Sequence, residues 1–235
     1  MMLTPKLLDY RRLVEQRKTC RECRELTNPS ACAGGLHDRD HLGPWSRWQG
    51  SLDAEVMVIG QDWGDDKYFK DNDGYDNPEN PTNATLRMLL DSIGLKIDSP
   101  LSTDDGGGTL FFTNAILCLK QGGMQSKVQP AWFRNCAPRF LRPTIELVQP
   151  KIVITLGGHA YRAVSRSYDQ KVLNFRQAVE HQPGFLLRPD TWNFPVYHCG
   201  KKTININRSL DWQLADWARI GRAIRDQSMG VGRTT

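Results

Sequence analysis

Residues 55–64, Glu-Val-Met-Val-Ile-Gly-Gln-Asp-Trp-Gly, decide the fold class. The apolar, β-branched run at 56–59 ends in a glycine, which predicts a buried strand that leads into a loop. Similar runs predict strands at 110–116, 151–156 and 194–199. Helical patterns separate these runs, and strands that alternate with helices form parallel sheets. We therefore expect a three-layer α/β/α sandwich around a central, mostly parallel sheet of four strands.

The helices are predicted from apolar residues at helical spacing. They are expected at residues 3–17, 82–94, 130–149, 157–166 and 209–226. In the third of them, Pro138 and Pro143 should break or kink the chain, because proline lacks the amide N–H of a helical hydrogen bond. In the last of them, we expect Trp212 and Trp217 to lie in the core.

The segments between these elements are rich in turn-forming residues. Residues 20–50 are predicted to be irregular and to need a cross-link that holds them to the core. Residues 61–81 are acidic and predict a long loop, of the kind that is often functional. This loop should end where Thr82 or Asn83 caps the next helix. The glycine-rich residues 101–108 predict a flexible link.

The composition is that of an ordinary globular chain. Its 235 residues are 39% hydrophobic and 24% charged, which excludes collagen-like, coiled-coil and wholly disordered proteins. The length favours a single domain over residues 1–235. No apolar run approaches the roughly 20 residues of a membrane span, and the N-terminus has no secretory signal pattern. We expect a cytoplasmic monomer, and its net charge of +5 fits a polyanionic partner only weakly.

The chain has six cysteines, at Cys20, Cys23, Cys32, Cys118, Cys136 and Cys199. The pair Cys20-x-x-Cys23 is typical of half a metal site in a cytoplasmic protein. Cys32 and His37 would complete a local zinc set with this pair. Alternatively, the pair joins the distant Cys118 and Cys136 around a [4Fe–4S] cluster. A third interpretation is a set of buried free cysteines, and spacing alone does not choose among the three.

Polar residues follow the predicted strands. In an open α/β sheet, functional groups lie beyond the carboxyl ends of the strands. The sequence places Asp62, Asn114, Gly157-Gly158-His159 and His198 there. Each has a plain structural explanation when taken alone, such as a turn, a loop tie or a core histidine, so it is their common position that predicts a site. A modest basic group that would contact phosphates follows the last strand, at Lys201, Lys202 and Arg208.

Taken in order, these motifs resemble the uracil-DNA glycosylase superfamily, and its iron–sulfur branch most. That branch has a C-x-x-C after an N-terminal helix, a strand followed by G-E-x-P-G, and a leucine-rich helix. A strand ending in T-N-x-x-x-C follows, then a cysteine before a long helix, a P-K-x-I-x-x-L-G strand and a last strand ending in Y-H. The matching stretches are residues 20–23, 60–64, 86–90, 113–118, 136, 150–157 and 197–198.

The resemblance implies a reaction and the residues that carry it. The reaction is hydrolysis of the N-glycosidic bond of uracil or a related deaminated base in DNA, the first step of base excision repair. Asp62 would orient water and stabilise the oxocarbenium-like sugar, and His198 would donate a hydrogen bond to the leaving base. The implied substrate-binding residues are Gln61, Trp63, Gly64, Tyr75 and Asn114, of which Asn114 pairs with the uracil edge. The four thiolates of the cluster would be structural.

Three departures from the family pattern bear on these roles. Gln61-Asp62 resembles the G-Q-D-P-Y motif of the cluster-free branch, which makes Asp62 a better catalytic candidate than Gln61. Gly64 replaces the tyrosine that excludes a 5-methyl group in that branch. The stacking phenylalanine of the family has no clear match. Tyr75 is the nearest candidate, with Tyr68 and Phe69 behind it.

Two other functions stay open. One is a non-catalytic nucleic-acid-binding or damage-sensing module with the same fold. The other is a zinc-stapled hydrolase that acts on free nucleosides. Activity on uracil-containing DNA and on free deoxyuridine separates these possibilities. The sequence leaves open which base is preferred and whether single or double strands are accepted.

Overall fold

A computed structural model describes residues 4–101, 109–181 and 184–230. The predicted flexible link at 101–108 lies, except for residue 101, outside the described residues. Within the described ranges, no helix is long and apolar enough to cross a membrane.

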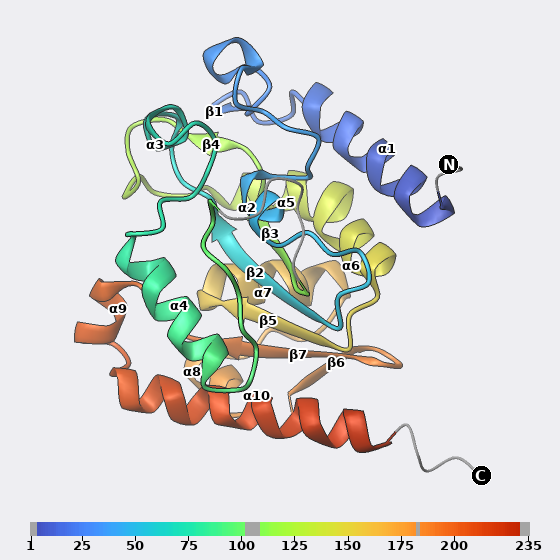
Figure 1. Ribbon diagram of the computed structural model, residues 1–235, viewed down its shortest axis with the longest axis vertical. Coiled ribbons are helices and arrows are strands. Elements are labelled where there is room, and N and C mark those ends of the chain that lie inside the picture. Colours follow the sequence, from blue (N-terminus) through green and yellow to red (C-terminus); the bar gives the residue numbers. More distant parts are fainter. Residues whose placement is uncertain (1–3, 102–108, 182–183, 231–235) are drawn as a thin grey trace.

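A five-stranded sheet forms the centre of the protein (Figure 1). Its strand order is β3 (Phe111–Ile116), β2 (Val56–Asp62), β5 (Ile152–Leu156), β7 (Thr191–Val196) and β6 (Phe185–Arg188). The first four strands are parallel, which confirms the α/β prediction with a mainly parallel sheet.

The fifth strand, β6, is missing from the prediction. It pairs antiparallel with β7, and the two are joined through Pro189-Asp190. This dipeptide is a turn signal, but the run before it, Phe-Leu-Leu-Arg, is short and lacks β-branched residues. The strand β7 also begins earlier than predicted and ends at Val196, so that Tyr197 and His198 lie beyond it.

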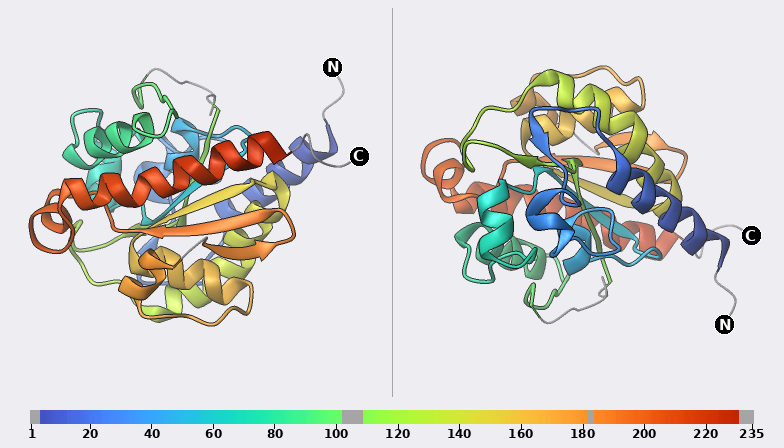
Figure 2. Two further views of the ribbon diagram at one scale, coloured as in Figure 1. Left: turned by 90° about the horizontal axis from the view of Figure 1, so that it is seen from below. Right: turned by 90° about the horizontal axis from the view of Figure 1, so that it is seen from above.

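Both faces of the sheet are buried. Along β2, Met57 and Ile59 belong to one core cluster, whereas Val56 and Val58 belong to the other. Successive residues of a strand point to opposite faces, so an unbroken apolar run is expected in a strand covered on both sides. In Figure 2 (left), the sheet lies between α10 (Leu210–Gly230) on one face and α7 (Gly157–Ser167) on the other.

The remaining helices divide between these two layers. The α7 side also contains α1 (Pro5–Thr19), α5 (Pro130–Cys136) and α6 (Arg142–Val148). The α10 side contains α2 (Pro44–Trp48) and α4 (Pro81–Asp91). The other short elements are β1 (Leu26–Thr27), η1 (Cys32–Gly35), α3 (Asp66–Asp71), β4 (Leu119–Lys120), η2 (Ala137–Leu141), α8 (Phe175–Glu180) and α9 (Lys201–Ile206).

The α-helix predicted over residues 130–149 is interrupted at its two prolines, as expected, although no non-helical segment separates the parts. The chain stays helical, and η2 is a π-helical turn that joins α5 to α6. Pro138 lies at the start of this turn, and Pro143 lies at the start of α6. A π-turn accommodates a proline because the backbone locally bonds over five residues instead of four.

The helix α4 starts one residue earlier than predicted and has a different cap. The side chain of Asn80 accepts a hydrogen bond from the N–H of Thr82, which corrects the prediction that Thr82 or Asn83 is the cap. Asn83 is instead buried and donates to the carbonyl of Asn77. The preceding loop contains the short helix α3, which is capped by Asp65.

The two tryptophans of α10 differ in burial. Trp217 is fully buried between the helix and the sheet, as predicted. Trp212 is 61% exposed, so its assignment to the core was wrong. The guanidinium carbon of Arg208 instead lies over the indole ring of Trp212, 4.8 Å from it. A cation–π contact of this kind leaves the other face of the ring exposed to water. Trp212 and Trp217 are five residues apart on α10, so they lie about 140° apart around the helix and cannot both face the sheet.

Candidate functional site

A pocket of about 720 Å³ opens at the carboxyl edge of the sheet. Residues at or near the carboxyl ends of β2, β3, β5 and β7 line it, together with parts of α4 and α9. We call it the strand-end pocket. Of the predicted site residues, it brings together Gln61, Asp62, Trp63, Asn114, His198, Lys201 and Lys202.

The floor of the pocket depends on Gly60. This residue is directly opposite Asn114 in the parallel register of β2 and β3. A Cβ atom at position 60 would lie 2.6 Å from Nδ2 of Asn114 and 2.9 Å from Cζ3 of Trp45. Only glycine therefore allows the amide and the indole edge to meet above β2. Trp45, from α2, lines the pocket and was not predicted as a site residue.

The side chain of Asn114 is 5% exposed and lines the pocket. In the described part of the chain, its amide has no hydrogen-bond partner. The amide is reached from the pocket, so it is available for a ligand that offers both a donor and an acceptor.

Asp62 forms a buried ion pair that the sequence analysis did not predict. Its Oδ1 lies 3.1 Å from Nζ of Lys120, and the two side chains are 6% and 4% exposed. Its Oδ2 accepts a hydrogen bond of 2.6 Å from Nε2 of Gln61. The ammonium of Lys120 also donates to the carbonyl of Met124. A carboxylate has about four lone-pair sites, so Asp62 can still accept from a water in the pocket.

His198 is fixed as a hydrogen-bond donor. The N–H of Gly200 donates to its Nδ1 over 3.0 Å, so the proton of the neutral ring is on Nε2. The surrounding pocket walls lower the pKa of His198 by desolvation, and the negative charge of Asp62 opposes this effect without reversing it. A neutral imidazole that donates through Nε2 is the form favoured at neutral pH.

His159 lies close to the same carboxylate. Burial and the charge of Arg162 lower the pKa of His159, whereas Asp62 raises it. The strand-end pocket therefore places two imidazoles near the carboxylate of Asp62, while a second carboxylate, Asp76, also lines it. His159 is a site residue that the sequence marked only as part of a turn.

Three predicted site residues do not line the pocket. The guanidinium of Arg47 covers the ring of Tyr75, 3.3 Å from its centroid, which keeps this ring away from the pocket. Arg208 is held by both carboxylate oxygens of Asp216, at 2.9 and 2.7 Å. A Cβ atom at Gly64 would lie 2.9 Å from Sδ of Met124, which itself lines the pocket in its place.

The two alternative candidates for the stacking residue, Tyr68 and Phe69, also make contacts away from the pocket. Tyr68 donates from its hydroxyl to Asp76, and Phe69 is buried. The rings that do line the pocket include Trp45, Trp63, Phe175 and Tyr197. Phe175 belongs to α8, which the sequence did not predict, so no pattern marked it in advance.

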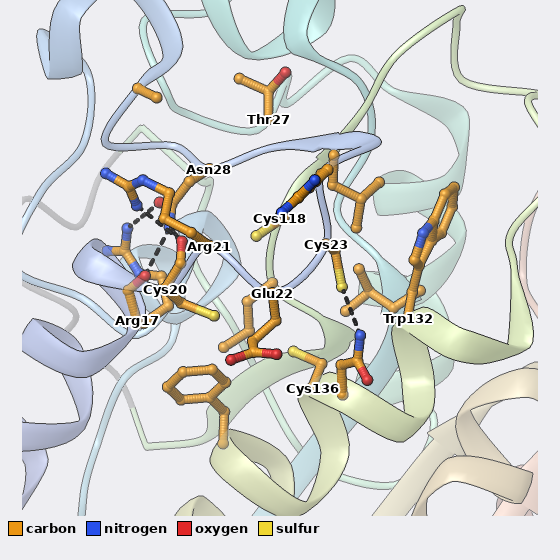
Figure 3. A pocket seen from close by; sticks show the side chains of 17 residues that line it. Arg17, Cys20, Arg21, Glu22, Cys23, Thr27, Asn28, Cys118, Trp132 and Cys136 are labelled. Atoms are coloured by element: carbon orange, nitrogen blue, oxygen red, sulfur yellow. Dashed lines mark hydrogen bonds between the residues drawn. The ribbon is translucent and has the colours of Figure 1, made fainter.

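Four cysteines meet in a second cavity of about 500 Å³, next to α1 and α5 (Figure 3). Figure 3 shows the sulfur atoms of Cys20, Cys23, Cys118 and Cys136 pointing toward a common space. The first two follow α1, the third lies between β3 and β4, and the fourth ends α5. We call this space the cysteine cavity.

The thiols of this cavity affect one another. Burial, with the neighbouring Cys20 and Cys23 as smaller causes, raises the pKa of Cys118 to about 12. Burial also raises the pKa of Cys136, with the other three cysteines as additional causes. The positive charges of Arg17 and Arg21 act in the opposite direction on Cys118. Four thiols and two cations are therefore gathered around one cavity.

Cys32 and His37 lie apart from this set. Cys32 belongs to the opposite core cluster, and its thiol faces the carbonyl of Asp66. His37 faces Asp73, with 3.5 Å between Nδ1 and Oδ1. Among the described residues, no group of three histidine, cysteine, aspartate or glutamate side chains is arranged to hold a metal ion.

Comparison with known families adds an independent finding. The family model described as Uracil DNA glycosylase superfamily matches residues 48–209, more than half of the chain. The match covers the strand-end pocket except for Trp45, and it starts after Cys20 and Cys23. No curated protein matches the chain.

The buried ion pair makes a prediction about stability. Replacing Lys120 by methionine leaves the carboxylate of Asp62 buried without its counter-charge, which should cost about 3–5 kcal/mol in the free energy of unfolding. Adding Asp62→Asn to this variant removes the unpaired charge and should recover most of the loss. Urea denaturation followed by circular dichroism measures both changes.

Lys151→Met is the matched control, because Lys151 pairs with Glu55 at the exposed surface. Its loss should stay within about 1 kcal/mol. The ion pair would have no such role if Lys120→Met were as mild as this control, or if the double variant were no more stable than the single one.

Proposed function

Because the chain belongs to the uracil DNA glycosylase superfamily, we propose that it hydrolyses the N-glycosyl bond of uracil, or of a related deaminated base, in DNA. In this reaction the bond between C1′ and the base nitrogen breaks, and its electron pair leaves with the base. A water oxygen then bonds to C1′, and the proton that water loses balances the charge of the departing base. The observation that carries the proposal is the buried, unpartnered amide of Asn114 beside Asp62 and His198.

Asn114 recognises the base in this proposal. Its Nδ2–H donates to uracil O4, and its Oδ1 accepts from uracil N3–H. Cytosine presents the opposite pattern at these two positions, so the same amide orientation rejects it. The target nucleotide must leave the DNA stack to reach this depth, which costs a few kcal/mol and is cheapest at a mispair. The edge of Trp45, which meets Asn114 above Gly60, supplies an apolar wall for the ring.

Asp62 positions the attacking water. Lys120 and Gln61 hold its two oxygens from one side, which fixes the carboxylate plane and leaves lone pairs for a water molecule. The neighbouring ammonium of Lys120 offsets much of the negative charge of Asp62. Asp62 therefore contributes more by orienting the water than by attracting the positive charge of the oxocarbenium-like sugar. A well-oriented carboxylate speeds the reaction because the water is already ordered before the bond breaks.

His198 stabilises the leaving base. Its Nε2–H is free to donate to the carbonyl oxygen on which negative charge develops, while Gly200 holds Nδ1. Lys201 and Lys202 follow at the start of α9 and are exposed at the pocket rim, where they would contact phosphates.

We further propose that Cys20, Cys23, Cys118 and Cys136 hold a [4Fe–4S] cluster, which would place the protein closest to the iron–sulfur branch of the superfamily. The convergence of four thiols in the cysteine cavity supports this assignment over a single zinc ion, because a cluster spreads its ligands over a larger cage. The cluster supplies cross-linking: it would tie the segment after α1 to the β3–β4 connection and to α5.

The first functional prediction concerns base recognition. The wild type, incubated with oligonucleotides that contain uracil, hypoxanthine or xanthine, should leave alkali-labile sites at one or more of these bases. Asn114→Asp removes the donor to uracil O4 and should slow uracil excision roughly ten- to hundredfold. Asn207→Asp is the matched control at the exposed rim of the same pocket and should stay near the wild-type rate.

A wild type that binds DNA but excises none of these bases would instead favour the non-catalytic module. Equal losses in Asn114→Asp and Asn207→Asp would show that the negative charge, and not base recognition, causes the effect.

The second functional prediction concerns the chemical step. Asp62→Asn and His198→Ala should each lower the single-turnover excision rate by about 10²–10³, with little change in DNA affinity. Both groups serve one charge-separated transition state, so the double variant should lose less than the sum of the two free energies. If both single variants excise uracil at the wild-type rate, the chemistry lies elsewhere.

The third prediction concerns the cysteine cavity. Anaerobically purified protein should be brown and contain roughly four irons per chain. Cys136→Ser should lose colour and iron, whereas Cys199→Ser should keep both, because Cys199 is buried outside the cavity. Colourless wild type with stoichiometric zinc would overturn the cluster assignment.

A further inference from the structure

A third cavity, of about 730 Å³, runs between α5–η2–α6 and α7. We call it the arginine groove, because Arg134, Arg142, Arg162 and Arg166 line it. His159 lines both this groove and the strand-end pocket, so the two are neighbours. No part of the proposed reaction uses the groove.

Three of the four arginines carry uncompensated charge. Arg142 is bound by Glu146 and lies over the ring of Tyr168. Within the described ranges, Arg134, Arg162 and Arg166 form no ion pair with an aspartate or glutamate. Asp169 is the one carboxylate among the residues that line the groove. The groove therefore has an excess of positive charge that suits a polyanion.

Placing Arg162 and Arg166 close together raises the free energy of the folded protein, and packing does not explain why they are close. They lie four residues apart on α7, where like charges destabilise a helix. Burial and the charge of Arg166 together lower the pKa of Arg162. The guanidinium of Arg162 lies against the turn at the pocket mouth, since a Cβ atom at Gly158 would be 3.1 Å from its Nη1. Two repelling cations kept at this mouth are explained by a ligand that carries successive negative charges.

The walls of the groove are apolar and aromatic. The ring of His159 stacks on Phe133, with 5.3 Å between centroids and 4° between planes. Ala137 and Pro138 of the π-turn η2 form part of the opposite wall, and π-turns are frequent at functional sites. Aromatic faces next to arginines are the features that bind unpaired nucleotides, because bases stack while guanidinium groups contact phosphates.

We propose that the arginine groove binds an unpaired DNA strand that continues from the nucleotide in the strand-end pocket. Arg162 and Arg166 contact successive phosphates, Arg134 contacts a third from α5, and a base stacks on the exposed face of His159. The direction of the strand rests on the proposed function, whereas binding of undamaged strands does not. The inference makes single-stranded or locally opened DNA the preferred substrate class.

Fluorescence anisotropy with a lesion-free oligothymidine and with a blunt duplex of equal length tests the groove. Arg162→Gln/Arg166→Gln should weaken binding of the single strand at least tenfold at low salt. It should also reduce the slope of log K against log salt by roughly 1.4, because each phosphate contact on a single strand contributes about 0.7. Arg222→Gln/Arg225→Gln is the matched control, since it removes two exposed charges from α10, outside the groove.

The outcomes separate clearly. Equal losses in the two double variants would reduce the effect to net charge and overturn the proposal. Duplex binding as tight as single-strand binding, with the same dependence on Arg162 and Arg166, would overturn the assignment to an unpaired strand. Competition by free thymidine monophosphate as effective as competition by the oligonucleotide would identify a nucleotide site in place of a strand groove.

Excision is measured separately. If the wild type excises no base but the arginine variants still lose single-strand affinity, the result supports the proposal that the groove binds a single strand and contradicts the glycosylase proposal. If excision proceeds and the variants bind undamaged strands normally, the groove proposal fails alone.

Discussion

The buried ion pair between Asp62 and Lys120 joins the parts of this protein that the candidate site needs. Lys120 reaches Asp62 through its ammonium, donates from its backbone N–H to the carbonyl of Gly64 and pairs in β4 with Leu26 of β1. Its ammonium also holds the carbonyl of Met124. One residue therefore ties the end of β2, the loop after β4 and the segment after α1. A buried ion pair of this kind is costly to break, because removing one partner leaves an unpaired charge in the interior.

The short segment 114–120 links the two cavities. Asn114 lines the strand-end pocket, Cys118 lines the cysteine cavity, and Lys120 holds Asp62. A centre bound at the cysteine cavity would therefore stiffen the same segment that orients Asn114 and Asp62. This offers a physical reason for a structural cofactor at a distance from the chemistry. The site depends on groups held to a fraction of an ångström, and loops hold such groups less firmly than cross-linked segments do.

Sequence reasoning reached the fold and the strand ends because both depend on local, periodic signals. The apolar run at 56–59 and the rule for carboxyl edges were enough to place Asp62, Asn114 and His198 in one region. It missed Lys120, since a lysine in a short strand carries no signal that it will be buried. It missed Trp45 and Phe175, because their places follow from tertiary packing of α2 and α8. Tyr75 was chosen by closeness in sequence, but the guanidinium of Arg47 covers its ring in the folded chain.

Charge explains how a carboxylate can work inside a site for a polyanion. An uncompensated Asp62 would repel each phosphate that approaches the strand-end pocket, and the repulsion would be strong where the surroundings exclude water. Pairing it with Lys120 cancels most of this field at the distance of the DNA backbone while leaving the oxygen lone pairs in place for water. Positive charge then remains near the pocket, because Lys201 and Lys202 line it and the arginine groove shares His159 with it. Under the proposed function, the buried pair would separate two tasks that conflict electrostatically: holding an anion at the chemistry and attracting a polyanion to the mouth of the pocket.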